Sequence, residues 1–174
     1  VFSENYLYTA EAFDLYLSRL APDGILNVMR LEYRPPREML RALTTAVAAL
    51  RRGGAARPSD HLLMLTATNG YFTALLVKKT PFTTGEISRV SAWAAGSRFF
   101  AVSAAPSLNG RAENLYQIFL ALDSAAAERE FTADYPFDVT PVTDDRPFFF
   151  RHAFWWHLVR GDPAVRAGIP VLEL

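Results

Sequence analysis

The stretch HLLMLTATNGYFTALLVKK, residues 61–79, decides the fold class of this chain. Two apolar runs flank Asn69 and Gly70, residue types that tolerate positive φ, and this is the strongest short signal for a β-hairpin. The uncharged run 62–77 is shorter than the roughly 18 to 20 apolar residues that a membrane-spanning helix needs, and polar residues interrupt its middle. We therefore predict two antiparallel strands, at about 61–68 and 71–78.

A helix and a strand precede this hairpin. Between residues 8 and 20 apolar side chains recur at helical spacing, and Thr9 is placed to cap the first amide groups. The turn PDG at 22–24 ends that helix. The run from Ile25 to Leu31 is short and apolar, which is typical of a buried parallel strand. Together these segments predict an αβ unit.

A second helix lies between this strand and the hairpin. Pro35 and Pro36 are suited to its first turn, because proline lacks an amide that would have no partner there. Its buried stripe consists of Met39, Leu40, Leu43, Val47 and Leu50. Gly53 and Gly54 are expected to end it.

The part of the chain after the hairpin is predicted to be mainly helical. Thr83 and Glu86 have capping-box spacing, which predicts a helix from Thr84 to about Ala95 that Gly96 ends. Residues 98–103 can form one more short strand. The last predicted elements are a helical stripe of Leu115, Ile118, Phe119 and Leu122, a short helix capped by Asp123, and an irregular connection over residues 135–145.

The composition narrows the classes of function. A chain of 174 residues is long enough for one domain with its own core. Eighteen basic and eighteen acidic residues cancel, so we expect no nucleic-acid partner. The absence of cysteine excludes disulfides, thiolate zinc sites and cysteine nucleophiles. His61, His152 and His157 lack the spacing of metal ligands, and we predict no metal site.

The end of the chain combines aromatic and basic residues in FFFRHAFWWHLVRG, residues 148–161. Such a segment suits a membrane interface or a groove on a partner. The alternative is a helix packed on the core of its own domain.

Four stretches resemble the carboxyl-terminal half of spermidine synthase-like proteins, which have a class I S-adenosylmethionine-dependent methyltransferase fold. They are ENYLYTAEAFDLYLSRLAPDGILNVMR (4–30), PPREMLRAL (35–43), FTALLVKKTPFTTGEISRV (72–90) and YPFDVTPVTDDRPFFF (135–150). The similarity is greatest to large bacterial versions in which such a domain is joined to multiple membrane-spanning helices. It covers nearly all of residues 1–151. Its motifs are a specific signal of the family when they occur together, and each of them alone is a weak signal.

The resemblance implies an α/β, partial Rossmann-like methyltransferase fold. In this assignment residues 25–31 form strand 5 and the hairpin forms strands 6 and 7, in the order 5, 7, 6 with flanking helices. Strands 1 to 4 would lie upstream, so the segment ENYLYTAEAF is expected to be the middle of a domain. Residues 1–150 would belong to this domain, and residues 151–174 would form a tail that begins a membrane-proximal segment.

The cofactor implied by the resemblance is S-adenosylmethionine or its decarboxylated form, bound by the upstream half. The glycine-rich turn and the catalytic Asp after strand 4 would both precede Val1. Gly53 and Gly54 follow a helix, which is the wrong context for a phosphate or adenosyl cradle. We therefore predict no catalytic and no cofactor-binding residue in this chain, and no catalysis by it alone.

The candidate substrate-binding residues are Glu4, Asn5, Tyr6 and Tyr8. In the resembling proteins this segment borders the substrate cleft, and a carboxylate with phenols can bind a polyamine by charge and ring face. The alternative is that these residues cap and pack the start of the first helix. Asp144 and Asp145 are adjacent in an extended segment and point apart, so a capping role or pairing with Arg146 is favoured over acid–base chemistry.

Two functions follow from these observations. The first is the carboxyl-terminal part of a transferase that moves an aminopropyl or methyl group, in the cytoplasmic part of a membrane protein and with its own upstream half as partner. The second is an interaction or regulatory module without catalysis. It would pair with itself as a homo-oligomer or with membrane helices, because loss of strands 1 to 4 leaves strand 5 with an unpaired edge.

Overall fold

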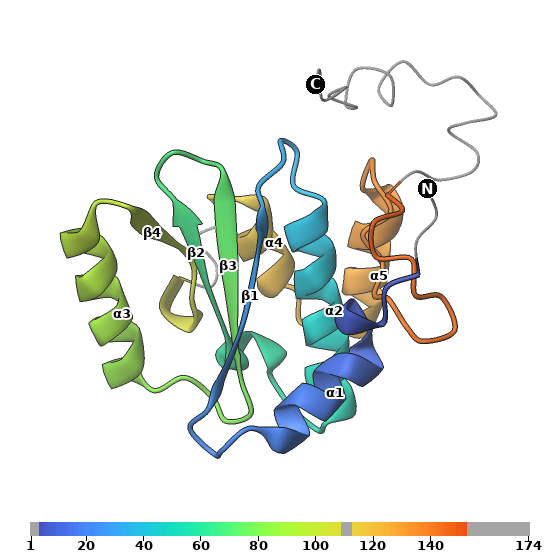
Figure 1. The fold of residues 1–174 in the computed structure, drawn as a ribbon, viewed down its shortest axis with the longest axis horizontal. Helices are drawn as coiled ribbons and strands as arrows, with labels where there is room; N and C mark the ends of the chain where they lie inside the picture. The colour runs from blue at the N-terminus through green and yellow to red at the C-terminus, as the bar shows by residue number, and fades with distance from the viewer. Residues whose placement is uncertain (1–3, 109–112, 153–174) are drawn as a thin grey trace.

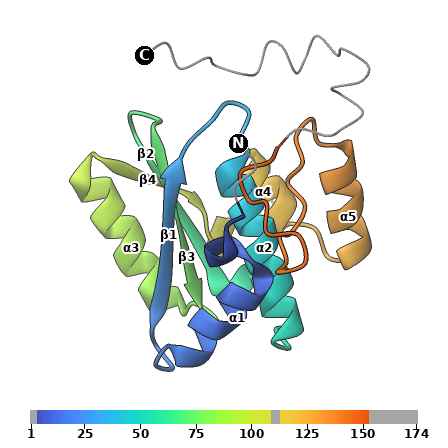
Figure 2. The ribbon, with the colours of Figure 1, turned by 45° about the vertical axis from the view of Figure 1, so that its right-hand side comes forward.

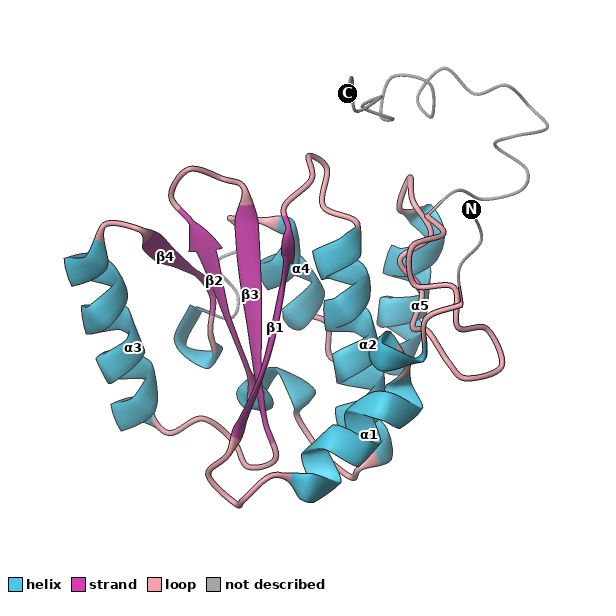
Figure 3. Ribbon diagram, in the orientation of Figure 1, coloured by secondary structure: helices cyan, strands magenta, loops and turns pink. Residues whose placement is uncertain are grey.

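The computed structural model describes residues 4–108 and 113–152. Within them the chain forms an antiparallel four-stranded sheet with α-helices on both faces (Figure 1, Figure 3). The strands are β1 (Ile25–Leu31), β2 (Leu62–Ala67), β3 (Phe72–Lys78) and β4 (Phe100–Ala104). The helices are α1 (Ala10–Arg19), α2 (Glu38–Arg52), α3 (Thr84–Ser97), α4 (Leu115–Leu120) and α5 (Ala125–Asp134), with the 3-10 helices η1 (Tyr6–Tyr8), η2 (Pro58–His61) and η3 (Pro106–Leu108). The predicted mixture of α-helices and β-strands is confirmed.

The predicted hairpin forms the centre of the sheet, whose strand order is β1-β3-β2-β4. β2 and β3 pair from Leu62 opposite Val77 to Thr66 opposite Thr73. In the connecting loop Gly70 has positive φ (77°). The Tyr71 amide donates a hydrogen bond to Asn69 Oδ1 (3.1 Å), so Asn69 stabilises the turn through its side chain.

β1 lies at one edge of the sheet, beside the second arm of the hairpin. It pairs antiparallel with β3, from Ile25 opposite Lys78 to Leu31 opposite Phe72. The predicted neighbour of residues 25–31 is thus confirmed, but the prediction of a buried parallel strand is wrong. Val28 is the one buried residue of β1. An apolar edge strand has the same run of residues as a buried one, so the sequence pattern alone does not separate them.

All neighbouring strands in the described sheet are antiparallel, including β2 with β4 at the other edge. A Rossmann-like sheet is mostly parallel. These four strands therefore do not by themselves establish that fold.

Two cores lie on opposite faces of the sheet. The larger contains side chains of α1, α2 and α4, including Phe13 and Leu43, packed on Leu75 of β3. The smaller lies under α3 and includes Leu63 and Ile87. Figure 2 shows α3 on one side of the sheet and the other α-helices on the opposite side.

α3 leaves the β1 side of its sheet face uncovered. Ile25, Met29 and Leu31 alternate along β1 and are 45%, 48% and 45% exposed, and the adjacent Phe72 is 43% exposed. Met29 lies opposite Ala74, a residue of the smaller core, so these side chains share the α3 face. We call these four residues the open strip. Three of them lie on β1, whose outer edge pairs with no strand among the described residues, and Phe72 lies on the neighbouring β3.

Several local signals in the sequence act as predicted. Thr9 Oγ1 accepts a hydrogen bond from the Ala12 amide (3.1 Å). Thr83 and Glu86 form the capping box at the start of α3. Gly53 is the residue that caps the carboxyl end of α2, and the predicted apolar stripe of α2 is buried.

Three predicted helix boundaries are wrong. α2 begins at Glu38, after the two prolines, because a residue that precedes proline is restricted to extended conformations. α3 continues through Gly96 to Ser97, and Arg98 takes the left-handed conformation (φ 59°). The cap of α5 is Ser124, whose hydroxyl accepts from the Ala127 amide (3.2 Å), since Ser is as good a cap as Asp.

In residues 4–108 and 113–152 no helix combines the length and the apolar character required to cross a bilayer. The predicted tail is described at Arg151 and His152, and its remainder lies outside the described residues.

Candidate functional site

The predicted substrate-binding residues lie in the short segment before α1. Asn5 caps η1, because its Oδ1 accepts a hydrogen bond from the Leu7 amide (3.0 Å). The Tyr6 hydroxyl donates to Glu4 Oε2 (3.0 Å), and this hydrogen bond raises the pKa of Tyr6. Asn5 thus has the capping role that the alternative interpretation gives it. Glu4 and Tyr6 stay at the surface.

Tyr8 is the member of this segment that reaches across the domain. Its ring stacks on Phe149, with centroids 4.4 Å apart, and meets the Phe150 ring edge-on at 6.3 Å. The Arg30 guanidinium, from β1, lies 5.5 Å from the Tyr8 ring centre and 5.0 Å from that of Phe150. A cation of the chain itself therefore lies at the faces of these rings.

Arg30 is held in place by Glu38 in the first turn of α2. Its Nε and Nη2 donate to Glu38 Oε2 at 2.9 Å and 2.6 Å. Burial lowers the pKa of Arg30, but the hydrogen bond and charge of Glu38 outweigh burial and raise it. The pair fixes the end of β1 against α2.

Glu32 follows β1 and continues its pairing, since the Glu32 amide donates to the Tyr71 carbonyl (2.8 Å). Arg30 and Glu32 are two positions apart in extended backbone, so their side chains project from the same face. Both Glu32 carboxylate oxygens accept from the Tyr116 hydroxyl of α4, at 2.7 Å each. Within the described ranges no Lys, Arg or His lies within ion-pair distance of Glu32.

Two phenols near Glu32 keep their protons. Burial and then the charge of Glu32 raise the pKa values of Tyr116 and Tyr135 far above the ordinary value of tyrosine. The Tyr135 hydroxyl donates to the Pro36 carbonyl (2.6 Å), which anchors the ring at the loop before α2. Both phenols are therefore neutral hydrogen-bond donors beside Glu32.

This arrangement can bind an organic ammonium group. Glu32 is half-buried, and a partly desolvated carboxylate favours a cation more strongly than a fully hydrated one. Sequence reasoning did not single out Glu32, although a charged residue directly after an apolar strand was a usable signal for a polar position at the end of the sheet.

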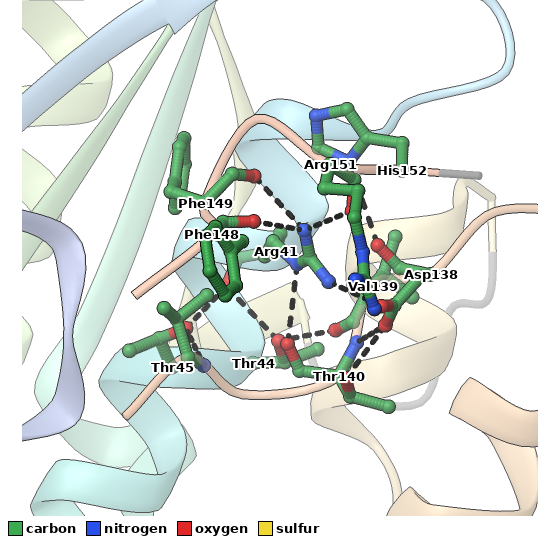
Figure 4. A network of polar contacts seen from close by, with 11 residues as sticks. Arg41, Thr44, Thr45, Asp138, Val139, Thr140, Phe148, Phe149, Arg151 and His152 are labelled. Atoms are coloured by element: carbon green, nitrogen blue, oxygen red, sulfur yellow. Dashed lines mark hydrogen bonds and ion pairs between the residues drawn. The ribbon is translucent and has the colours of Figure 1, made fainter. Parts of the chain in front are cut away.

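A buried Arg41 on α2 positions the aromatic residues of this site (Figure 4). Its side chain is 4% exposed, and its Nη1 donates to the carbonyls of Phe148 (3.0 Å), Phe149 (3.0 Å) and Arg151 (2.6 Å). Its Nη2 lies 2.7 Å from Asp138 Oδ2. These bonds fix residues 138–151 on α2 and thereby place Phe149 against Tyr8.

The other candidate groups do not form sites. The Asp144 amide donates to Glu11 Oε2 (3.0 Å), and neither Asp144 nor Asp145 lies within ion-pair distance of Arg146, so the expected pairing with Arg146 is not formed. Over the described parts of the chain no three His, Asp or Glu side chains gather in a way that could hold a metal ion. His157 lies outside the described residues.

Comparisons of the chain with protein-family models, with curated proteins and with solved structures found no match. The functional interpretation therefore depends on the chemistry of the site.

Proposed function

We propose that this chain is the distal part of a spermidine synthase-like transferase domain, and that Glu32 with its neighbouring phenols binds the amine of the acceptor substrate. One observation carries the proposal: Glu32 is a half-buried carboxylate at the end of β1 whose hydrogen-bond donor is the neutral Tyr116 hydroxyl. A substrate ammonium would supply the charge that no described side chain supplies. The segment 4–8 borders this site through the contact of Tyr8 with Arg30.

The sheet supports the same proposal. The order β1-β3-β2 corresponds to the order 5, 7, 6 that the resemblance implies. The unpaired edge of β1 and the open strip are what the resemblance predicts if further strands of a Rossmann-like sheet continue at that edge in the parent protein. We propose that strands 1 to 4 of the parent cover this surface.

The residues described here do not fit the proposed cofactor of the parent, S-adenosylmethionine or its decarboxylated form. Gly53 and Gly54 follow α2, so they do not form the strand-to-helix turn that binds such ligands. We therefore derive no step through this cofactor. Transfer of an aminopropyl or methyl group is proposed for the parent, and inactivity for the chain alone.

The amine proposal is tested by titrating the 174-residue chain with putrescine and spermidine at low salt, followed by NMR. The Glu32→Gln variant is expected to bind about tenfold more weakly, because one partly buried charge interaction is worth about 1.4 kcal/mol. Glu130→Gln is the matched control, since Glu130 is an exposed acid on α5. Equal binding by Glu32→Gln and the wild type would contradict the proposal.

A separate titration tests whether binding of the cofactor requires the upstream half of the parent domain. Calorimetry with S-adenosylmethionine, its decarboxylated form and their thioether product is expected to show no saturable binding by this chain. Tight binding of any of them would mean that the upstream half is not needed.

The open strip also favours a second candidate function, an interaction module that pairs with a second copy or with membrane helices. Exposed apolar side chains at an unpaired strand edge promote association. Sedimentation at several concentrations discriminates the two functions, because a strict monomer would count against the module. On the basis of the resemblance, we also propose that the domain lies in the cytoplasmic part of a membrane protein.

A further inference from the structure

A cavity of about 600 Å³ lies between α2 and the segment 138–151. Its wall includes three guanidinium-bearing residues, Arg41, Arg146 and Arg151, and two carboxylates, Asp138 and Asp145. The wall therefore has one more cation than anion. Tyr8, Arg30 and Glu32 are not among its lining residues, so the Glu32 site does not use it.

The three arginines in this wall differ in whether a carboxylate pairs with them. Arg41 is paired with Asp138 at 2.7 Å. Arg146 and Arg151 have no carboxylate within ion-pair distance among the described residues. The Arg151 guanidinium packs over the Phe148 ring, with its Cζ atom 5.8 Å from the ring centre.

Arg151 also lies close enough to Arg41 for the two charges to repel. Burial is the main cause that lowers the pKa of Arg41, and the charge of Arg151 lowers it further. A cavity wall that carries more guanidinium groups than carboxylates is suited to binding an oxyanion.

Hydrogen bonds hold the main chain in place at Arg146 and Arg151, the two arginines of this wall without a carboxylate partner among the described residues. The Arg151 carbonyl accepts from Arg41 Nη1 (2.6 Å), and the Arg146 amide donates to the Thr143 carbonyl (2.9 Å). Thr143 also lines the cavity, and its hydroxyl can donate to an oxyanion. The main chain at both arginines therefore needs little further ordering when an anion binds.

We propose that this cavity binds a small oxyanion, a phosphate or a carboxylate group, through Arg146 and Arg151 with the Thr143 hydroxyl as a further donor. The negative charge of Asp145 repels the ligand, and it repels a dianion more strongly than a monoanion. The site is independent of the proposed amine site, so either proposal can fail without the other.

The test is a titration of the full 174-residue chain with inorganic phosphate, methyl phosphate and acetate, at constant ionic strength with chloride as the counter-anion. NMR reports binding, and thermal unfolding reports stabilisation. The phosphate and acetate arms separate a phosphate site from a carboxylate site. The variants are Arg146→Gln, Arg151→Gln and Asp145→Asn, with Arg89→Gln as the control because Arg89 is an exposed arginine on α3.

The Arg151→Gln variant keeps the backbone carbonyl that Arg41 binds, and Arg146 is exposed, so both variants are expected to fold. Each should weaken binding of the preferred anion about tenfold or more, since each removes a charge-assisted hydrogen bond to the anion. Asp145→Asn should tighten it, and Arg89→Gln should leave it unchanged. Binding that is equal in the wild type and in both arginine variants, or no binding by the wild type, would overturn the proposal.

Discussion

The buried guanidinium of Arg41 and the carboxylate of Asp138 form an ion pair at 2.7 Å that joins α2 to the segment after α5. Burial alone would raise the pKa of Asp138, but the charge of Arg41 and the Thr140 hydrogen bonds outweigh it and lower the pKa. Arg41 also satisfies the carbonyls of Phe148, Phe149 and Arg151. One side chain thus links the core to the aromatic wall of the candidate site.

Replacing Arg41 by Met should destabilise the domain by about 3 to 5 kcal/mol, because Asp138 would remain partly buried without its partner. Urea denaturation measures the change. Arg57→Met is the control, since the Arg57 side chain is 72% exposed and its pairing with Asp60 is long (3.5 Å). That variant should lose less than about 1 kcal/mol. Similar losses in the two variants would show that the Arg41 network is not a main source of stability.

His152 should make stability depend on pH. Burial and then the charge of Arg41 lower the pKa of His152 to about 3, and its Nε2 is buried without a hydrogen-bond partner among the described residues. The ordinary histidine pKa is about 6.5, so the unfolded chain binds the proton more readily, and stability falls as the pH drops from about 6.5 towards 3.

The measurement is the free energy of unfolding of the wild type and of His152→Asn between pH 7 and 4. The wild type should lose up to about 1.4 kcal/mol more per pH unit than the variant below pH 6. Acids that do not contact His152 contribute to both proteins alike, so the difference reports on His152 and its coupling to Asp138. Parallel curves would refute the assignment.

The open strip should drive self-association of the 174-residue chain. Leu31→Lys places a charge on the exposed edge strand, and edge charges are a common means of preventing such pairing. We expect this variant to remain monomeric at concentrations at which the wild type associates, as measured by sedimentation velocity. Leu15→Lys is the control, because Leu15 is 54% exposed on α1, away from the sheet edge. Association that persists in Leu31→Lys and disappears in Leu15→Lys would place the interface elsewhere.

Tyr116→Phe should destabilise the domain by about 1 to 3 kcal/mol, because Glu32 would lose its hydrogen-bond donor. Addition of spermidine should restore part of this loss if the ammonium group replaces the donor. Thermal unfolding with and without spermidine measures both effects. A variant as stable as the wild type would mean that the Glu32 carboxylate is well hydrated.

The sequence predicted those features that depend on neighbouring residues. The hairpin at Asn69 and Gly70, the Thr9 cap and the capping box at Thr83 are decided within a few positions, and all three are confirmed. The exposure of β1 depends on which elements cover it, and the apolar run from Ile25 to Leu31 does not contain that information.

The candidate site was harder to predict, because its members come from distant segments. Glu32 becomes distinctive only when α4 brings Tyr116 to it, and Arg41 only when residues 138–151 fold back on α2. Of the predicted substrate-binding residues, the structure brings Tyr8 into contact with the end of β1, and gives Asn5 a local capping contact. Long-range pairing of this kind leaves no periodic signal in one sequence.

The central claim, that the end of β1 binds an amine, is tested most directly by mapping amide chemical-shift changes during a spermidine titration. The account predicts that the largest changes occur at Glu32 and Tyr116, with smaller ones at Tyr8. Changes centred on the exposed acids of α5, or spread evenly over the surface, would contradict it.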